Sequence, residues 1–148
     1  MFDAEHFVYN YKEDKDYAMA CIVTAQVAGA STVTLCDTNG GAIPSQIRQI
    51  ITEIRGLIEC DIGIHCHNDT DMAVASTLAA VEEGATQIQA CLNGWGERTG
   101  NANMISVIPN LKLKLGLDVV GEEQLKRLTE TALFASELAN FTPNSQQP

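Results

Sequence analysis

The sequence has little positive charge: nine Lys and Arg against 19 Asp and Glu give a formal net charge of −10. Proteins that bind nucleic acid or anionic membranes need clusters of Lys and Arg, so we expect neither as a partner. No run approaches the roughly 18 apolar residues of a membrane-spanning helix. The N-terminal stretch MFDAEHFVYNYK is acidic and lacks the apolar core of a signal peptide. These absences predict a cytoplasmic protein.

The cysteines lack the pattern of a disulfide scaffold or a zinc site. There are five of them, an odd number, and none has the CxxC spacing. Reduced thiols in a cytosolic protein are the plain interpretation. The 148 residues suffice for one ordinary domain with a real core.

Strand-like and helix-like segments alternate along the chain. Short β-branched and apolar runs predict strands at 31–37, 60–66 and 86–94. Apolar residues at helical spacing predict helices at 15–30, 44–58, 69–85 and 101–115. Such alternation is typical of parallel strands joined by right-handed crossovers. Since the first 13 residues resemble the end of an earlier strand and its loop, we predict four βα units, the first incomplete, and a further amphipathic helix at 121–140.

Polar clusters follow the predicted strands. They are DAEHF (3–7), CDTNGG (36–41), HCHND (65–69) and NGWGERTGN (93–101). Parallel α/β folds carry their chemistry in the loops that follow the strands. One such cluster could be ordinary turn chemistry, but four at the same end of successive units favour a shared site.

Two histidines, His65 and His67, stand two residues apart at the end of a predicted strand, so their side chains point to one face. Neutral imidazoles in that position could share a divalent ion. A hydrogen-bonded pair without a metal is the alternative, and an isolated HxH pattern does not decide between them. The apolar residues that precede the pair favour a buried site. Asn68 and Asp69 could both cap the next helix, and Asp69 is the one expected to do so.

The other clusters each allow a structural and a functional interpretation. The loop 93–101 has three glycines, so it must turn tightly and can approach a ligand with its backbone. Asn101 could cap the next helix or ligate a metal, and without context capping is favoured. Thr38 could offer a hydroxyl to a substrate oxygen, or its cluster could be a plain turn. Glu5 and His6 are either solvated loop residues or acid/base groups near the metal.

Together the motifs resemble one family, the Claisen-condensing acyltransferases: 2-isopropylmalate, homocitrate and citramalate synthases, within the metal-dependent lyase superfamily. HCHND and NGWGERTGNAN carry the resemblance as a pair, and LCDTNGG and ISVIPNLKLKLG are most similar to the citramalate synthase branch. The resemblance implies an α/β fold, namely the C-terminal half of a (β/α)8 TIM barrel with about four βα units at 1–116. A C-terminal helix and the start of a linker subdomain would follow at 117–148.

The resemblance also implies a metal-dependent reaction. His65, His67 and Asn101 would ligate a divalent metal (Mg, Mn, Zn or Co), which makes ligation the better prediction for Asn101. The metal would bind a 2-oxoacid and make its carbonyl electrophilic. A base would remove a methyl proton from acetyl-CoA, the co-substrate, and the resulting carbanion would attack that carbonyl before the thioester is hydrolysed.

The remaining residues of the clusters receive roles from the same resemblance. Thr38 would hold the substrate carboxylate, and Glu5 would assist the proton removal. Glu97 and Arg98 would line the same pocket, without an assigned role.

The family's fourth metal ligand, an Asp on the first barrel strand, has no counterpart in this sequence, nor does the Arg beside it. A full barrel needs about 200–250 residues. We therefore expect a fragment of an acyltransferase of branched-chain amino-acid biosynthesis that converts an acyl group to alkyl on transfer. Pyruvate, giving citramalate, is the preferred 2-oxoacid and 2-oxoisovalerate, giving 2-isopropylmalate, the next. The isolated chain should have little activity, and its open sheet edges predict a homo-oligomer or pairing with an N-terminal half-barrel.

Two other functions compete with this one. The first is a structural half-barrel that needs a partner chain to complete the site. The second is a metal-dependent C–C lyase of the same superfamily. Such lyases carry a Cys in the glycine-rich loop, and NGWGERTGN has none, which disfavours the lyase.

Overall fold

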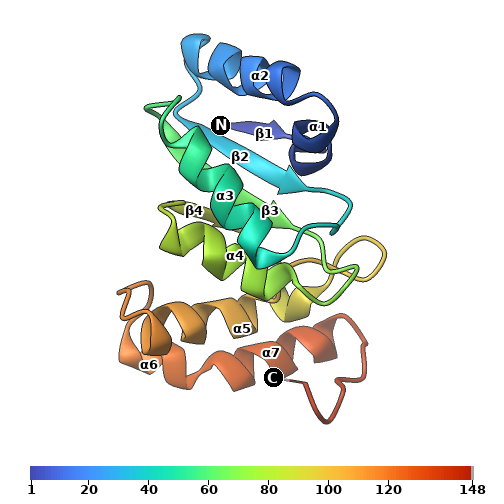
Figure 1. Ribbon diagram of the computed structural model, residues 1–148. Coiled ribbons are helices and arrows are strands. Elements are labelled where there is room, and N and C mark those ends of the chain that lie inside the picture. The colour runs from blue at the N-terminus through green and yellow to red at the C-terminus, as the bar shows by residue number, and fades with distance from the viewer. Residues whose placement is uncertain (148) are drawn as a thin grey trace.

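The computed structural model describes residues 1–147 and contains one parallel sheet with the strand order β1-β2-β3-β4 (Figure 1). The strands are β1 Phe2–Ala4, β2 Thr32–Asp37, β3 Asp61–Cys66 and β4 Gln87–Gln89. Each strand pairs in parallel with the next strand along the chain. The predicted α/β fold, a partial barrel of four parallel βα units, is confirmed.

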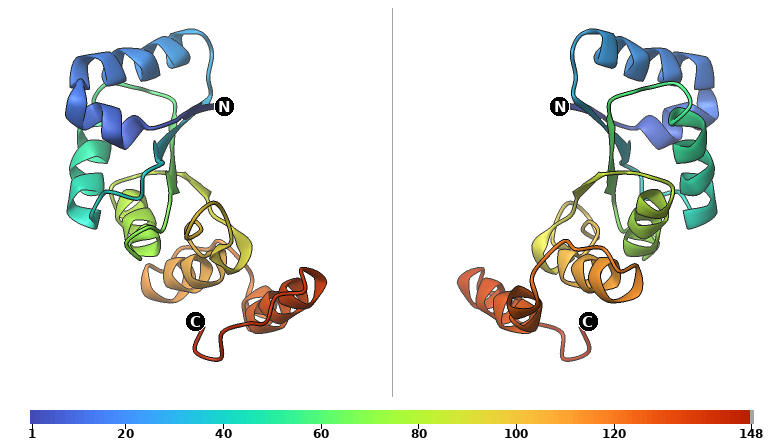
Figure 2. Two further views of the ribbon diagram at one scale, coloured as in Figure 1. Left: turned by 90° about the vertical axis from the view of Figure 1, so that its right-hand side faces the viewer. Right: turned by 90° about the vertical axis from the view of Figure 1, so that its left-hand side faces the viewer.

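Helices follow the strands and cover one side of the sheet (Figure 2). They are α1 Phe7–Glu13, α2 Lys15–Val27, α3 Pro44–Ile54, α4 Ala73–Glu82 and α5 Met104–Pro109, which continues into a π-helical turn, η2, at Asn110–Lys114. Two further helices end the chain, α6 Glu122–Lys126 and α7 Leu128–Leu138. The opposite side of the sheet has no helical cover from β1 to β4 within residues 1–147.

The hydrophobic core lies between the sheet and these helices. It contains apolar side chains of β2 and β3 and the apolar face of α3: Val33, Leu35, Ile62, Ile64, Ile47, Ile51 and Ile54. Each fully buried side chain of this size contributes roughly 1.5–3 kcal/mol relative to an exposed one. Pro44 occupies the first helical position of α3, where its missing N–H costs nothing. This packing fixes the positions of β2 and β3 and therefore of the loops that follow them.

The other face of the sheet is polar. Register pairs Thr34 with Gly63 and Gly63 with Gln87, so these residues form one layer. The Thr34 hydroxyl donates to Gln87 Oε1 at 3.2 Å across Gly63. A Cβ atom on Gly63 would lie 2.2 Å from Gln87 Oε1, so glycine makes this crossing feasible. The next layer contains His65 and Gln89.

The structure corrects several predicted boundaries. Residues 7–13, expected as a loop, form the helix α1, which ends at Asp14. Asp14 also begins α2, because its side chain accepts a hydrogen bond from the backbone N–H of Tyr17. The strand expected at 86–94 ends at Gln89, and a short 3-10 turn, η1 (Leu92–Gly94), follows around Asn93, whose φ is 57°. The helix expected at 101–115 begins only at Met104. The helix expected at 121–140 is divided into α6 and α7 at Arg127.

The division into 1–116 and 117–148 stays a prediction. Its boundary falls between η2 and α6, and α7 packs on α5 and η1. Asn93 Nδ2 donates to the Ala132 carbonyl at 2.9 Å, and Trp95 meets Phe141 edge-to-face at 5.3 Å. The last predicted residue of the linker, Pro148, lies outside the described residues. Within residues 1–147 no helix has the length and apolar character needed to cross a membrane.

Candidate active site

The loops after the strands meet at one end of the sheet, as the polar clusters predicted. After β1, Glu5 reaches the loop after β2: the Thr38 hydroxyl donates to Glu5 Oε2 at 3.0 Å. The backbone N–H of His6 donates to the same hydroxyl oxygen at 2.9 Å. Thr38 is thus held between two loops, with its proton directed toward a carboxylate.

His65 and His67 lie side by side at the end of β3, with ring centroids 5.1 Å apart. His65 belongs to the strand, whereas His67 lies just beyond it and forms an isolated bridge with Asn101. Both rings therefore share one face, as their spacing predicted.

Asn101 contacts the histidine pair and does not cap a helix. Its Nδ2 lies 2.9 Å from His65 Nε2, and its side chain is buried. The cap of α5 is Asn103, which accepts from the N–H of Ile105 at 3.0 Å. The atom that faces His65 is the amide nitrogen, while the amide oxygen faces Cys91 Sγ at 3.5 Å. Ligation by Asn101, which would use that oxygen, stays a prediction.

A second contact holds His65 from its other side. Its Nδ1 lies 2.8 Å from Gln89 Oε1 on β4. Gln89 Nε2 in turn donates to Asp3 Oδ1 on β1 at 2.9 Å. Neither Gln89 nor Asp3 was singled out from the sequence. The available signal was the alternation QIQ at 87–89, which puts two amides on one face of an otherwise apolar strand.

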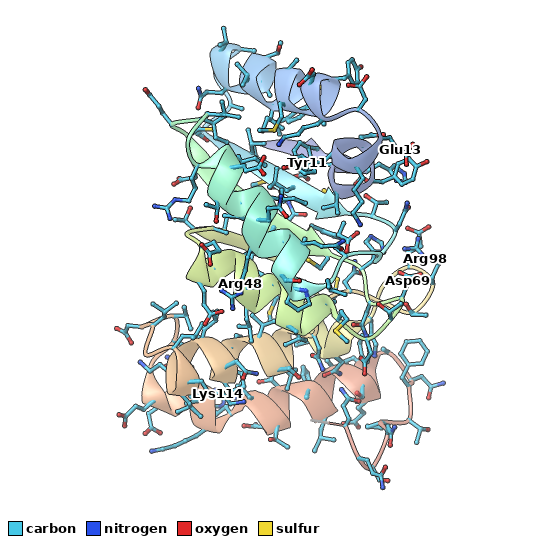
Figure 3. The ribbon with its side chains drawn as sticks, viewed as in Figure 1. Tyr11, Glu13, Arg48, Asp69, Arg98 and Lys114 are labelled. Atoms are coloured by element: carbon cyan, nitrogen blue, oxygen red, sulfur yellow. The ribbon has the colours of Figure 1, made fainter. Side chains whose placement is uncertain are left out.

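Arg98 is the most connected residue of the glycine-rich loop. Its Nη2 donates to the Thr38 carbonyl at 2.6 Å and lies 3.0 Å from His67 Nδ1. Its Nε donates to Asp69 Oδ2 at 2.8 Å (Figure 3). Glu97, by contrast, is exposed, and its nearest charged partner is Arg98 at 3.5 Å. Arg98 therefore joins the loops after β2, β3 and β4.

The expected capping role of Asp69 is wrong. The side chain that binds the first turn of α4 is Asn68, whose Oδ1 accepts from the N–H of Ala73 at 3.1 Å. Asp69 pairs with Arg98 instead, because Arg98 reaches back across the site from the next loop. That guanidinium lowers the pKa of the Asp69 carboxyl below its ordinary value.

The electrostatic environment favours neutral His67. Burial lowers its pKa from the ordinary value of 6.5, and the neighbouring His65 and Arg98 lower that pKa further. Because Arg98 is only a donor, it must face an unprotonated His67 Nδ1. Neutral His67 then carries its proton on Nε2.

Two glycines are required in the loop 93–101. Gly100 has a φ of 92°, and a Cβ atom there would lie 1.9 Å from the Gly94 carbonyl oxygen. A Cβ on Gly96 would lie 1.7 Å from Asn101 Oδ1. The loop folds back so tightly that Asn101 donates its own N–H to the Gly94 carbonyl at 3.0 Å. The glycines thus bring Asn101 to the histidines.

A sequence model of the HMGL-like family matches residues 6–134, most of the chain. The chain belongs to the HMGL-like family. The (R)-citramalate synthase of Geobacter sulfurreducens is 49% identical to it over 146 residues, which are 99% of this chain and 28% of the relative. The 2-isopropylmalate synthase of Buchnera aphidicola is 40% identical over 126 residues, 81% of this chain and 24% of the relative. The predicted resemblance, and its preference for the citramalate synthase branch, are confirmed.

This HMGL-like chain spans about a quarter of the length of these curated relatives. Among solved structures, the HMG-CoA lyase from Brucella melitensis superimposes with a TM-score of 0.69 at 21% identity, over 83% of this chain and 45% of the lyase. That likeness supports the barrel fold alone. The match to less than half of the lyase barrel agrees with a partial barrel.

The donors gathered in this HMGL-like site fit part of a metal centre. Two imidazoles and one amide, from His65, His67 and Asn101, are ligands that divalent first-row metals accept. Across residues 1–147, no three side chains of His, Cys, Asp and Glu converge as a metal site would require. The predicted ligand set of two imidazoles and an amide therefore contains no carboxylate, and its metal role stays a prediction.

Proposed function

We propose that this chain forms part of the catalytic barrel of a cytoplasmic acyltransferase that condenses acetyl-CoA with a 2-oxoacid. Pyruvate, giving citramalate, is the first choice of 2-oxoacid and 2-oxoisovalerate the second. The observation that carries the proposal is the 49% identity to an (R)-citramalate synthase over 99% of the chain. The reaction would serve branched-chain amino-acid biosynthesis.

His65, His67 and Asn101 would hold a divalent metal, Mg, Mn, Zn or Co. The ion would supply Lewis acidity at the carbonyl of the 2-oxoacid. A carboxylate ligand would come from outside these 148 residues, since the predicted ligand set lacks one. Arg98 must leave the Nδ1 atom of His67, or that ring must exchange its tautomer, before His67 can bind the ion through a free lone pair.

Thr38 and Glu5 would act on the two substrates. The Thr38 hydroxyl now donates to Glu5. A bound 2-oxoacid carboxylate would accept that proton instead, and Glu5 would lose its hydrogen bond. Binding of the first substrate would thus free the Glu5 carboxylate from Thr38, so that it could accept the methyl proton of acetyl-CoA.

A chimaera tests the chemistry of these residues. The matching segment of the Geobacter sulfurreducens (R)-citramalate synthase is replaced by this chain, and CoA release is followed with a thiol reagent. We expect metal-dependent CoA release with pyruvate. In the chimaera, Glu5→Gln should lower kcat by about 100-fold, in the range of a lost general base. Thr38→Val should mainly raise KM for the 2-oxoacid.

His6→Gln is the matched control, because His6 lies beside Thr38 but contributes only its backbone N–H. It should leave CoA release unchanged. A folded chimaera that releases no CoA with any 2-oxoacid would contradict the proposal. A rise in the kcat/KM ratio of 2-oxoisovalerate to pyruvate, relative to the Geobacter enzyme, would favour the second substrate choice.

The structural half-barrel alternative concerns the sheet edges. Among the described residues, β1 and β4 each pair on one side only, and Phe2 and Tyr17 are exposed beside β1. We infer that these edges pair with an N-terminal half-barrel or with a second copy of the chain. Co-expression with the N-terminal half of the Geobacter barrel should give a stable complex. A compact monomer by sedimentation, in the presence of that half, would contradict the pairing.

A further inference from the structure

His65 is held by residues of both edge strands, and these residues determine which of its nitrogens carries the proton. The contacts run from Asp3 on β1 to Gln89 on β4, and from Gln89 to His65 on β3. Asp3 and Gln89 are 86 positions apart in the chain, so the contact depends on the assembled sheet.

The first link determines how the Gln89 amide is oriented. A carboxylate only accepts hydrogen bonds, so the Gln89 group that faces Asp3 must be its NH2. The carbonyl oxygen of the amide, Oε1, therefore faces His65. Amide orientation is otherwise a matter of assignment, and here the carboxylate decides it.

The second link determines the tautomer of His65. The Gln89 oxygen can only accept, so His65 Nδ1 must carry a proton. A neutral imidazole has one such proton, which leaves the lone pair on Nε2. That atom lies 2.9 Å from Asn101 Nδ2, a donor in the proposed metal site, so the same tautomer suits both neighbours of the ring.

We propose that Gln89, oriented by Asp3, is a positioning residue that keeps His65 in the Nδ1–H tautomer and so presents Nε2 to the metal. The inference rests on the metal role proposed for His65. Partners that fix the tautomer and ring of a metal-binding histidine typically raise metal affinity 10–100-fold. All three residues stand in strands, and the Asn101 amide, which follows the glycine-rich loop, faces Nε2 with its Nδ2 and favours the same tautomer.

The test compares two glutamines of the same strand face in the 148-residue chain. Gln89→Met removes the acceptor for His65 and keeps the length of the side chain. Gln87→Met is the matched control, because Gln87 bonds to Thr34 and not to His65. Long-range ¹⁵N–¹H NMR of metal-free protein, above the ordinary His pKa of about 6.5, reads each tautomer, and His65→Gln assigns the signals.

Wild type and Gln87→Met should show His65 with a protonated Nδ1 and an unprotonated Nε2. Gln89→Met should show a mixture of tautomers. A His65 that stays in the Nδ1–H form in Gln89→Met would overturn the inference. The double variant Asp3→Asn with Gln89→Glu exchanges amide and carboxylate. The hydrogen bond between positions 3 and 89 then runs in the reverse direction, but position 89 still accepts from His65 Nδ1, so the wild-type tautomer should be restored.

Metal titration of the same proteins separates this inference from the proposed function. Gln89→Met should bind Mn²⁺ or Co²⁺ about 10–100-fold more weakly than Gln87→Met, and the exchanged pair should recover most of that loss. Equal affinities of Gln89→Met and Gln87→Met would overturn the positioning role while leaving the metal site in place. Absence of binding in every protein, with the tautomers as expected, would instead refute metal binding by the three donors of this chain alone and leave the tautomer inference standing.

Discussion

His65 and His67 are two residues apart and share a face, yet the structure holds them in opposite ways. His65 Nδ1 faces an acceptor, Gln89 Oε1, on a neighbouring strand. His67 Nδ1 faces a donor, Arg98 Nη2, on a loop. The first contact leaves Nε2 unprotonated, and the second places the proton there. The unprotonated Nε2 of His65 faces the neutral amide of Asn101, whereas the unprotonated Nδ1 of His67 faces the charged guanidinium of Arg98. Each ring must therefore release a neighbour before that lone pair can bind a metal.

The difference separates contacts made within the sheet from contacts made by the loops. The partner at Nδ1 of His65 is Gln89 on β4, which is itself held by Asp3 on β1, and strand pairing determines the positions of both strands. The partner at Nε2 is Asn101, which follows the glycine-rich loop. The partner of His67 comes from a loop whose Arg98 has a φ of 56°, an uncommon conformation for a residue other than glycine. We expect contacts made by the loop to change on substrate or metal binding and contacts made within the sheet to persist.

The largest expected effect is on metal affinity. His65→Gln should weaken binding of Mn²⁺ or Co²⁺ by at least about 100-fold, more than the loss of a supporting partner. His67→Gln should cost less, because wild-type binding through His67 must already break the contact with a charged guanidinium, whereas His65 releases only a neutral amide. Isothermal titration measures both, with His6→Gln as the control. A larger loss in His67→Gln than in His65→Gln would reverse the comparison.

Next in size is the effect of Gly100→Ala on the loop. A Cβ there meets the Gly94 carbonyl, and the positive φ adds strain, so we expect a loss of about 1–3 kcal/mol in the free energy of unfolding. NMR signals of His67 should shift, whereas the tautomer of His65 should stay. Gly41→Ala is the control, since a Cβ on Gly41 meets nothing within 4 Å. Loss of the His65 tautomer in Gly100→Ala would show that the loop, not the sheet, sets it.

A smaller effect concerns the titration of His67. Arg98→Met removes a positive charge that lowers the pKa of His67, so that pKa should rise toward 6.5, as measured by NMR titration. Arg127→Met, far from the pair, should leave it unchanged.

The sign for stability follows from the lowered pKa of His67. Between that pKa and 6.5 the unfolded chain binds more protons than the folded one, so stability falls as pH falls through this window. Because Arg98→Met should raise the pKa of His67, it should narrow the pH range over which stability falls. An unchanged pH dependence of the unfolding free energy in Arg98→Met would contradict this assignment.

The smallest effect lies far from the histidines, at Glu53. Its pKa is lowered to about 2, chiefly by the hydrogen bond from Lys15 and then by that from Tyr11. The carboxylate therefore stabilises the fold above its ordinary pKa of 4.5, and this contribution is lost as pH falls through about 2. Glu53→Gln should lower the urea midpoint slightly at pH 7 and not at pH 2. The pH range over which His67 changes the unfolding free energy should be the same in wild type and Glu53→Gln.

Much of this arrangement could be predicted from the sequence. The spacing of His65 and His67 was sufficient to put both on one face, and the glycines of NGWGERTGN predicted a tight loop. Helical periodicity located α3 because Ile47, Ile51 and Ile54 recur at every turn. These features depend on neighbours within a few positions, which a sequence displays directly.

Contacts between distant positions were missed. Nothing local tells that Gln89 meets Asp3, or that Asp69 leaves the helix it could have capped to pair with Arg98. Asn68 and Asp69 are both good caps, and only the position of the loop after β4 decides between them. The polar network around the histidines therefore becomes visible only when the strands are assembled.

The hydrogen bond between Asp3 and Gln89 also records the bend of the sheet. In a flat sheet the outer two of four strands would stand three spacings apart, about 14 Å, too far for an Asp and a Gln side chain to meet. Here Gln89 Nε2 and Asp3 Oδ1 are 2.9 Å apart. The sheet is therefore curved, and the hydrogen bond connects its two edge strands across the concave side. The presence of this hydrogen bond thus reports the curvature of the sheet. If it forms in the 148-residue chain in solution, the four strands alone are sufficient to maintain that curvature.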